Sequence, residues 1–416
     1  RYSPEQGTAI QDEVQKLAER GTIEPSRSAW AAACVTVRKK DGSLRLCQDF
    51  RGLNELLESY SGGLGDMQTT YSGLTGSKYF TSVDSASGFF QLEVAEEDRP
   101  FTAFRDARGH VWQYQRCRFG LTVRPATFHR PVSEALLPAR GVKKWLGNIL
   151  WPSATFAGHM TGLRVVLYSL LKAGLTVNFQ KSQWCTQQQD FVGMTIDASG
   201  IRPSQSKIEA IAQLGEPQRV EELRLCLGKT GYLRRYIKGD SNPAAPLTDL
   251  LRDPRFASKR ARRMEIPWGD QQQQAFLDLK SALMSYPILA YPDWNERFVL
   301  HSDASEFAAG VALAQEADER EWIIEYASHR WSRADEKRSA SEREVVVVLW
   351  SVERFRSYLW GREFTLVTDS SALTWLFRSQ NLSPKFHRWA LRLMEYDMVL
   401  KWRAGREHQL PDALSR

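Results

Sequence analysis

The chain has 416 residues, of which 42% are hydrophobic, enough for two or three packed domains and too many for wholesale disorder. No apolar run approaches the roughly 18 residues that a membrane span needs, and the polar first residues do not resemble a signal peptide. The five cysteines never form CxxC, which argues against a disulfide framework or a zinc site. They favour a reducing compartment, nucleus or cytoplasm, with an organelle left open. The formal net charge of +7 suits a polyanionic partner without requiring one.

The first half of the chain shows a mixture of helical and strand-like patterns. Residues 4–20 have helical spacing, with Ile10, Val14 and Leu17 on one face. The stretch KKWLGNILWP reads as two short strands around a tight turn. In chain order we expect a hairpin at 33–50, a strand at 78–84, a strand at 110–120, a helix at 125–137, the KKWLGNILWP hairpin at 143–152, a helix at 157–174 and a strand pair at 190–204.

The second half begins with two predicted helices and then changes its pattern. The basic segment 251–267 is the best linker candidate, either as a solvated loop or as a contact to phosphates. From about residue 291, three strands precede alternating helices and strands, which predicts an α/β layout with a mixed sheet. The expected elements are helices at 205–215 and 219–236, strands at 297–303, 310–316, 321–328 and 364–369, helices at 341–358, 372–377 and 385–396, and a last strand from 396.

Four acidic residues occupy strand ends and a helix start in this last region: Asp303, Glu344, Asp369 and Asp412. In a βββαβαβα sheet the first and fourth strands are neighbours, so Asp303 and Asp369 should emerge close together, with Glu344 presented from the helix packed across them. Converging carboxylates repel one another unless cations lie between them. Two Mg²⁺ ions about 4 Å apart could then hydrolyse a phosphodiester. The alternative is that these are ordinary strand-end and helix-start acids.

Three segments carry a family resemblance: HSDASEFAAGVALAQ, SASEREVVVVLWSVERFRSYLWGREFTLVTDSSALTWL and WRAGREHQLPDALSR. They resemble the RNase H domain of gypsy-type LTR retrotransposon Pol polyproteins. The resemblance covers residues 291–416. It implies that Asp303, Glu344, Asp369 and Asp412 are the metal-binding catalytic acids. Glu342 is the less favoured glutamate in this frame.

The upstream sequence resembles the reverse transcriptase of the same family. KYFTSVDSASGFFQLEVAEEDRPFTAF is similar to the palm segment whose first catalytic aspartate would be Asp84. The resemblance implies an α+β and α/β multidomain protein, in which a right-hand reverse transcriptase of fingers, palm and thumb precedes an RNase H-like mixed-sheet domain. The expected divisions are 1–200 for fingers and palm, 201–290 for the thumb and a basic connection, and 291–416 for the RNase H-like domain.

The family's second polymerase motif, a Tyr-x-Asp-Asp hairpin, aligns with Trp145 to Asn148. Both aspartates are replaced, by Gly147 and Asn148, which leaves Asp84 as the single acid. Asparagine is a poor ligand for a hard dication and glycine offers no side chain, so we predict that DNA synthesis is lost. The matching nucleotide-binding positions, which we regard as vestigial, are Lys39, Lys40, Arg45 and Phe89. A solvated hairpin and a core aromatic residue explain them equally well.

Three hypotheses remain open from the sequence. The first is a Mg²⁺-dependent endoribonuclease that cleaves RNA in RNA–DNA hybrids and carries a dead polymerase. The second is a domesticated, non-catalytic relic that binds nucleic acid or serves as a structural subunit with protein partners. The third is an ordinary retroelement polymerase whose hairpin was altered by deliberate mutation or sequence error.

Overall fold

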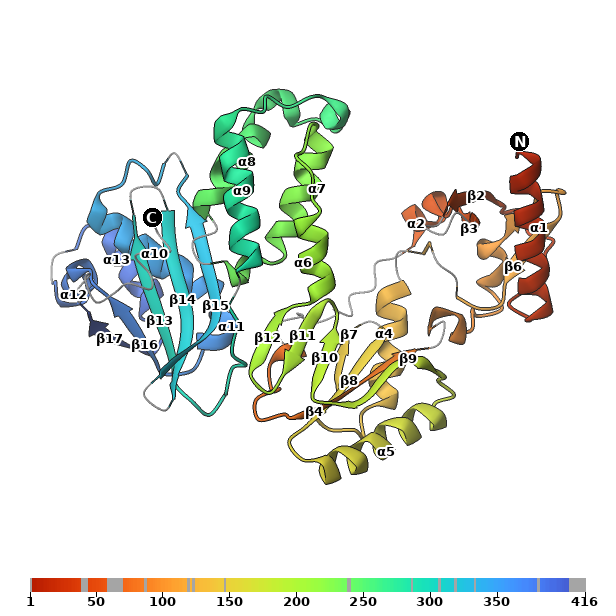
Figure 1. Ribbon diagram of the computed structural model, residues 1–416, viewed down its shortest axis with the longest axis horizontal. Helices are drawn as coiled ribbons and strands as arrows, with labels where there is room; N and C mark the ends of the chain where they lie inside the picture. Colours follow the sequence, from red (N-terminus) through yellow and green to blue (C-terminus); the bar gives the residue numbers. More distant parts are fainter. Residues whose placement is uncertain are drawn as a thin grey trace. The chain divides into compact units, whose positions relative to one another are not determined.

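The computed structural model describes residues 2–38, 44–57, 70–85, 88–117, 120–121, 124–145, 147–237, 241–285, 287–305, 308–317, 320–332, 334–379 and 382–403. The chain forms two compact units, Arg1–Val192 and Gly193–Arg416 (Figure 1). The division into three parts at residues 200 and 290 therefore remains a prediction. No helix in the described ranges is long and apolar enough to cross a membrane.

The first unit contains one five-stranded sheet and one four-stranded sheet, with helices packed against them. The sheet orders are β1-β6-β5-β2-β3 and β7-β8-β4-β9. The elements are α1 (Pro4–Glu19), β1 (Ile23–Pro25), β2 (Ala32–Arg38), β3 (Leu44–Gln48), α2 (Arg51–Leu56), β4 (Tyr79–Ser85), η1 (Gly88–Gln91), η2 (Arg99–Thr102), β5 (Phe104–Arg105), β6 (Val111–Tyr114), α4 (Arg124–Ala135), β7 (Lys143–Trp145), β8 (Asn148–Ser153), α5 (Phe156–Lys172), β9 (Val177–Thr186) and β10 (Gln188–Phe191).

The first helix confirms its sequence pattern. Its N-cap Ser3 forms a capping box with Gln6, and the predicted apolar face is buried at Ile10, Val14 and Leu17. This face packs in one core with residues of the five-stranded sheet. Burial of apolar side chains thus holds α1 against the five-stranded sheet.

The predicted hairpin at 143–152 is present as β7 and β8, with Trp145 opposite Asn148. Strand β8 also pairs with β4, and α5 packs against both (Figure 1). Val83, Phe128 and Ile149 are at most 1% exposed and share one core cluster. The hairpin is therefore fixed by its ladder and by apolar packing.

The second unit contains the antiparallel strand pair β11–β12, a helical part and a five-stranded mixed sheet of order β15-β14-β13-β16-β17. Its elements are β11 (Met194–Asp197), β12 (Gly200–Pro203), α6 (Gln205–Ala212), α7 (Val220–Gly231), η3 (Arg234–Tyr236), α8 (Ser241–Arg252), η4 (Pro254–Phe256), η5 (Lys259–Arg263), α9 (Asp270–Met284), β13 (Phe298–Ala304), β14 (Ala308–Ala317), β15 (Arg320–Arg330), α10 (Ala340–Arg354), α11 (Arg356–Leu359), β16 (Phe364–Thr368), α12 (Ser371–Arg378), α13 (Pro384–Leu393) and β17 (Met398–Trp402).

The basic segment 251–267, the linker candidate, lies within the second unit, and its role as a connection stays a prediction. It forms η4 and η5, short turns between α8 and α9. Phe256 and Ala261 are 2% exposed, so apolar residues between the arginines anchor the segment. The charge pattern alone did not reveal this anchoring.

The mixed sheet confirms the predicted neighbourhood of its first and fourth strands. β13 and β16 are parallel and pair from Phe298–Phe364 to His301–Val367. Helix α10 lies against β13, and α10, α12 and α13 contribute to one large core with this sheet (Figure 1). Val345, Val347 and Val348 of α10 are fully buried in this core.

A buried ion cluster joins the helical part of this unit to the sheet. Glu325 of β15 is fully buried and forms ion pairs with Arg354 of α10 and with Arg235 of η3, the latter at 3.6 Å. Asp249 of α8 also pairs with Arg330 of β15, at 2.7 Å. These contacts tie the segments on both sides of residue 290 to one another.

Candidate functional site

Three of the four predicted acids come together at one end of the mixed sheet. Asp303 lies near the end of β13, and Asp369 directly follows β16. Each is two residues beyond the last pair of the parallel ladder, His301–Val367, so both side chains are brought to the same level and face. Glu344 joins them from the first turns of α10.

The three carboxylates are close enough to share a cation. One oxygen from each of Asp303, Glu344 and Asp369 lies within 4.8 Å of the others. In the described part of the chain, this is the one group of acidic, histidine or cysteine side chains with such geometry. Hard dications such as Mg²⁺ prefer carboxylate oxygens, so the donor set fits one.

Glu344 carries the electrostatic cost of this arrangement. Burial first, and then the charges of Asp303 and Asp369, raise the pKa of Glu344 to about 8 from its ordinary 4.5. Its Oε2 is buried and has no hydrogen-bond partner among the described residues. A buried carboxylate oxygen without a partner next to two acids is an arrangement that a bound cation would satisfy.

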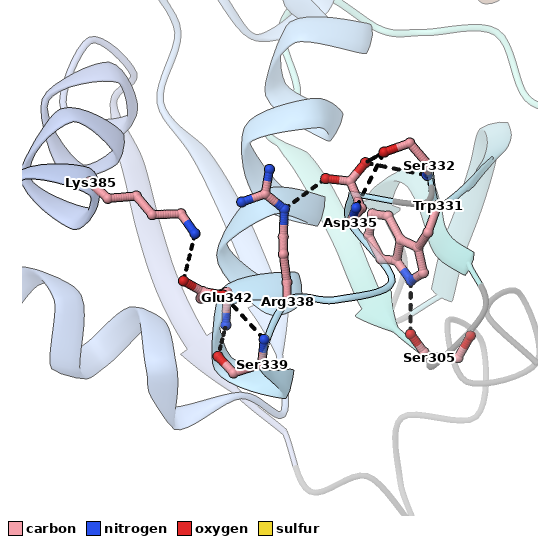
Figure 2. A network of polar contacts seen from close by, with 8 residues as sticks. All are labelled: Ser305, Trp331, Ser332, Asp335, Arg338, Ser339, Glu342 and Lys385. Carbon is pink, nitrogen blue, oxygen red and sulfur yellow. Dashed lines mark hydrogen bonds and ion pairs between the residues drawn. The ribbon is translucent and has the colours of Figure 1, made fainter.

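Neighbouring side chains hold the backbone that carries these acids. The Trp402 indole Nε1 donates to the Asp369 carbonyl at 3.1 Å. The buried Trp331 donates through Nε1 to the Ser305 carbonyl at 2.9 Å, two residues after Asp303 (Figure 2). Neither contact was predicted, because a tryptophan in a sequence looks the same whether it fills a core or fixes a strand end. For Trp331 the available signal was its position three residues after the predicted strand 321–328.

The first turn of α10 is held by a second group of contacts. Ser339 is the N-cap of the helix and forms a capping box with Glu342, which also pairs with Lys385 of α13 at 2.6 Å (Figure 2). Lys385 was missed as well, because nothing in the sequence links it to a residue 43 positions earlier.

The palm-like position presents a different set of groups. Asp84 of β4 lies directly opposite Asn148 of β8. Gly147 occupies the turn, where its carbonyl accepts a hydrogen bond from the Ser85 hydroxyl at 3.1 Å. A Cβ built on Gly147 would meet Phe128 at 3.5 Å, an ordinary contact, so a side chain has room there. The hairpin therefore presents Gly147 and Asn148, neither of which carries a carboxylate, beside Asp84 of β4.

Cations lie on the same hairpin. Burial lowers the pKa of both Lys143 and Lys144, which are half-buried on β7. Burial, followed by the charge of Lys144, also lowers the pKa of His129 on α4. Positive charge on these side chains disfavours the binding of a dication at the hairpin.

The other residues predicted to belong to the two sites lie wholly or partly outside the described part of the chain. Asp412, Lys39 and Lys40 lie outside the described residues. Arg45 lies in β3 and Phe89 in η1, but their side chains also lie outside the described part. Their roles therefore stay predictions.

Two family models match the chain. Residues 37–196 match the reverse transcriptase (RNA-dependent DNA polymerase) family, and residues 268–366 match the RNase H-like domain found in reverse transcriptase. The first range contains Asp84, Gly147 and Asn148, and the second contains Asp303 and Glu344.

Retroelement polyproteins are similar over nearly the whole chain. The retrovirus-related Pol polyprotein from transposon opus of Drosophila melanogaster is 33% identical over 98% of this chain and 42% of its own length. The transposon Tf2-7 polyprotein of Schizosaccharomyces pombe is 29% identical over 98% of this chain and 30% of its own length. The chain thus spans less than half the length of these curated relatives.

Solved structures support the fold. The foamy viral protease-reverse transcriptase in complex with dsDNA superimposes with a TM-score of 0.86 at 20% identity, covering 97% of this chain and 84% of that one. The same viral protein in complex with an RNA/DNA hybrid gives a TM-score of 0.82 at 20% identity, covering 97% and 54%. The predicted architecture of a reverse transcriptase followed by an RNase H-like domain is confirmed. The chain belongs to the reverse transcriptase–RNase H region of LTR-retrotransposon Pol polyproteins, and a gypsy-type origin is consistent with these matches.

Proposed function

We propose that this protein cleaves the RNA strand of RNA–DNA hybrids at the Asp303–Glu344–Asp369 cluster and has lost DNA synthesis. The observation that carries the proposal is the convergence of three carboxylates, one with an unpartnered buried oxygen, at the end of the mixed sheet. A foamy viral relative in fold was solved with an RNA/DNA hybrid, which supports this class of nucleic-acid partner.

The roles of the residues follow from their positions. Asp303 and Asp369 are supplied by adjacent parallel strands and Glu344 by the helix across them, with Asp412 proposed as the fourth ligand. Bound divalent ions, which we expect to be two Mg²⁺, would activate water and stabilise the leaving oxygen of the phosphodiester. Glu344 must give up its proton when it becomes a ligand, since the ligating form is the carboxylate. The 2′-hydroxyl distinguishes the RNA strand from DNA.

The proposed loss of polymerisation rests on the palm hairpin. Asp84 is opposed by the neutral Asn148, and Gly147 has no side chain to offer. Changes in residues that merely support metal ligands weaken binding by roughly 10–100-fold, and here two ligands themselves are replaced. Lys143 and Lys144 add positive charge to the same hairpin.

The decisive experiment is cleavage of a labelled RNA–DNA hybrid in millimolar Mg²⁺. Asp303→Asn is the test variant, and Asp278→Asn, an exposed acid on α9, is the matched control. We expect cleavage by the unchanged protein and by Asp278→Asn, and none by Asp303→Asn. Absence of cleavage by the folded, unchanged protein would favour a non-catalytic nucleic-acid-binding or structural role. Primer extension with the same preparation tests the loss of synthesis, and incorporation of nucleotides would contradict it.

A further inference from the structure

Glu342 lies two residues before Glu344 and uses both oxygens of its carboxylate. Its Oε2 accepts the backbone N–H of the N-cap Ser339 at 3.1 Å, and its Oε1 accepts Lys385 Nζ at 2.6 Å (Figure 2). The Ser339 hydroxyl in turn accepts the backbone N–H of Glu342 at 3.3 Å. One side chain therefore both caps α10 and joins it to α13.

Lys385 is a well-supported partner for Glu342. It is the second residue of α13, and its Nζ also lies 4.9 Å from the centre of the Trp389 ring one turn further on. Ala390 and Leu393 bury the inner face of α13 in the main core. The ion pair consequently connects the start of α10 to a firmly packed helix.

Helix geometry links this pair to Glu344. Two residues along an α-helix are separated by about 200° of rotation and about 3 Å of rise, so Glu342 and Glu344 leave α10 on nearly opposite sides. Glu342 is held toward α13, while Glu344 lies among Asp303 and Asp369. Tethering one side of the turn sets the direction in which the other side points.

The tether opposes a force that the site itself creates. When Glu344 is ionised without a bound cation, Asp303 and Asp369 repel it, and this repulsion favours movement of the first turn of α10 away from the strand ends. The side chains of Glu342 and Lys385 are 21% and 40% exposed, so the pair adds little to global stability. Its effect is local.

We propose that the Glu342–Lys385 pair is a positioning device that keeps Glu344 within ligand distance of Asp303 and Asp369. This inference rests on the proposed metal-dependent function of the same cluster. It makes Glu342, the glutamate disfavoured as a ligand by sequence, a supporting residue for its neighbour.

The chain provides a matched control between the same two helices. Arg392 of α13 forms an ion pair with Glu353 at the far end of α10, and both side chains are about half exposed (54% and 51%). Removing this pair alters the α10–α13 contact without touching the first turn of α10. It separates positioning of Glu344 from general helix packing.

The experiment compares Lys385→Met, Lys385→Arg and Arg392→Met in the full chain. Calorimetric titration with Mg²⁺ gives affinity, thermal unfolding gives Tm, and hybrid cleavage gives kcat and KM. We expect Lys385→Met to weaken Mg²⁺ binding about 10-fold, the lower end of what supporting residues at metal sites cost. At fixed Mg²⁺ its kcat should fall with the KM for hybrid unchanged, and added Mg²⁺ should restore it. Lys385→Arg should bind Mg²⁺ nearly as the unchanged protein does, and Arg392→Met should change Tm alone.

The possible failures are distinguishable. If the unchanged protein binds Mg²⁺ and cleaves, but Lys385→Met and Arg392→Met have equal Mg²⁺ affinities, the positioning role is overturned while the proposed function stands. A raised KM with unchanged kcat in Lys385→Met would make Lys385 a substrate contact and also overturn the positioning role. If the unchanged, folded protein neither binds Mg²⁺ nor cleaves, both proposals are overturned.

Discussion

The two sites predicted to bind metal are built in similar ways and carry different numbers of acids. In the palm, antiparallel β4 and β8 bring Asp84 opposite Asn148; in the RNase H-like sheet, parallel β13 and β16 deliver Asp303 and Asp369. The palm ladder, which carries the single acid Asp84 at this end, is held by one core cluster that includes Val83 of β4, Ile149 of β8 and Phe128 of α4. Fold and chemistry are therefore separable, and removing ionised groups from a strand end can even relieve repulsion.

The largest expected effect comes from removing another acid of the surviving site. Asp369→Asn should lower hybrid cleavage by on the order of 10³-fold, since metal ions contribute several kcal/mol of transition-state stabilisation. The same variant should raise the free energy of unfolding in chelator, because Asp303 then no longer faces the charge of Asp369. Gel-based cleavage and denaturant unfolding measure both. An equally active Asp369→Asn protein would remove the contrast between the two sites.

Restoring the palm acids tests the contrast from the other side. The double variant Gly147→Asp/Asn148→Asp should bind Mn²⁺ or Mg²⁺ at the palm at least about 10–100-fold more tightly than the parent. The space beside Phe128 admits the new side chain at residue 147. Calorimetry in an Asp303→Asn background isolates this site. Unchanged affinity would mean that the palm has lost more than its ligands.

The pH dependence of stability should distinguish the sites further. Between pH 4.5 and about 8, folded Glu344 keeps a proton that the unfolded chain releases. In chelator, the free energy of unfolding should therefore fall as pH rises through this window, by at most about 1.4 kcal/mol per pH unit. Glu344→Gln should remove that slope. Calorimetry in buffers of different ionisation enthalpy should also detect proton release on Mg²⁺ binding at pH 7, and an absence of release would contradict the assignment.

The smallest effect is expected at the remaining palm acid. Asp84→Asn should leave hybrid cleavage unchanged and alter the free energy of unfolding by no more than about 0.5 kcal/mol, because this half-buried side chain belongs to no carboxylate cluster among the described residues. Parallel cleavage and urea-unfolding assays are sufficient. A strong loss of cleavage on this change would show that the palm still serves the other site.

Much of this arrangement follows from the sequence for a physical reason. The alternation of β13 and the neighbouring position of β16 place Asp303 beside Asp369, and the spacing of Ile10, Val14 and Leu17 identifies the buried face of α1. Local periodicity encodes these features directly. The supporting contacts of Lys385, Trp331 and Trp402 join residues that are far apart along the chain. They depend on how α13, β15 and β17 pack, which no local pattern specifies.

The buried Glu325 sets a limit on how the RNase H-like part could be expressed as a fragment. A fragment starting at residue 291 would contain Arg354 but not Arg235, and would also lack η3 and α8, which pack on β15. It would lose one guanidinium partner of Glu325 and expose part of the surface of β15, which removes a share of a domain's small net stability. Truncation at 291 should therefore yield poorly soluble, protease-sensitive material. A piece beginning at Gly193 keeps the whole ion cluster and is the better starting point for crystallisation or NMR.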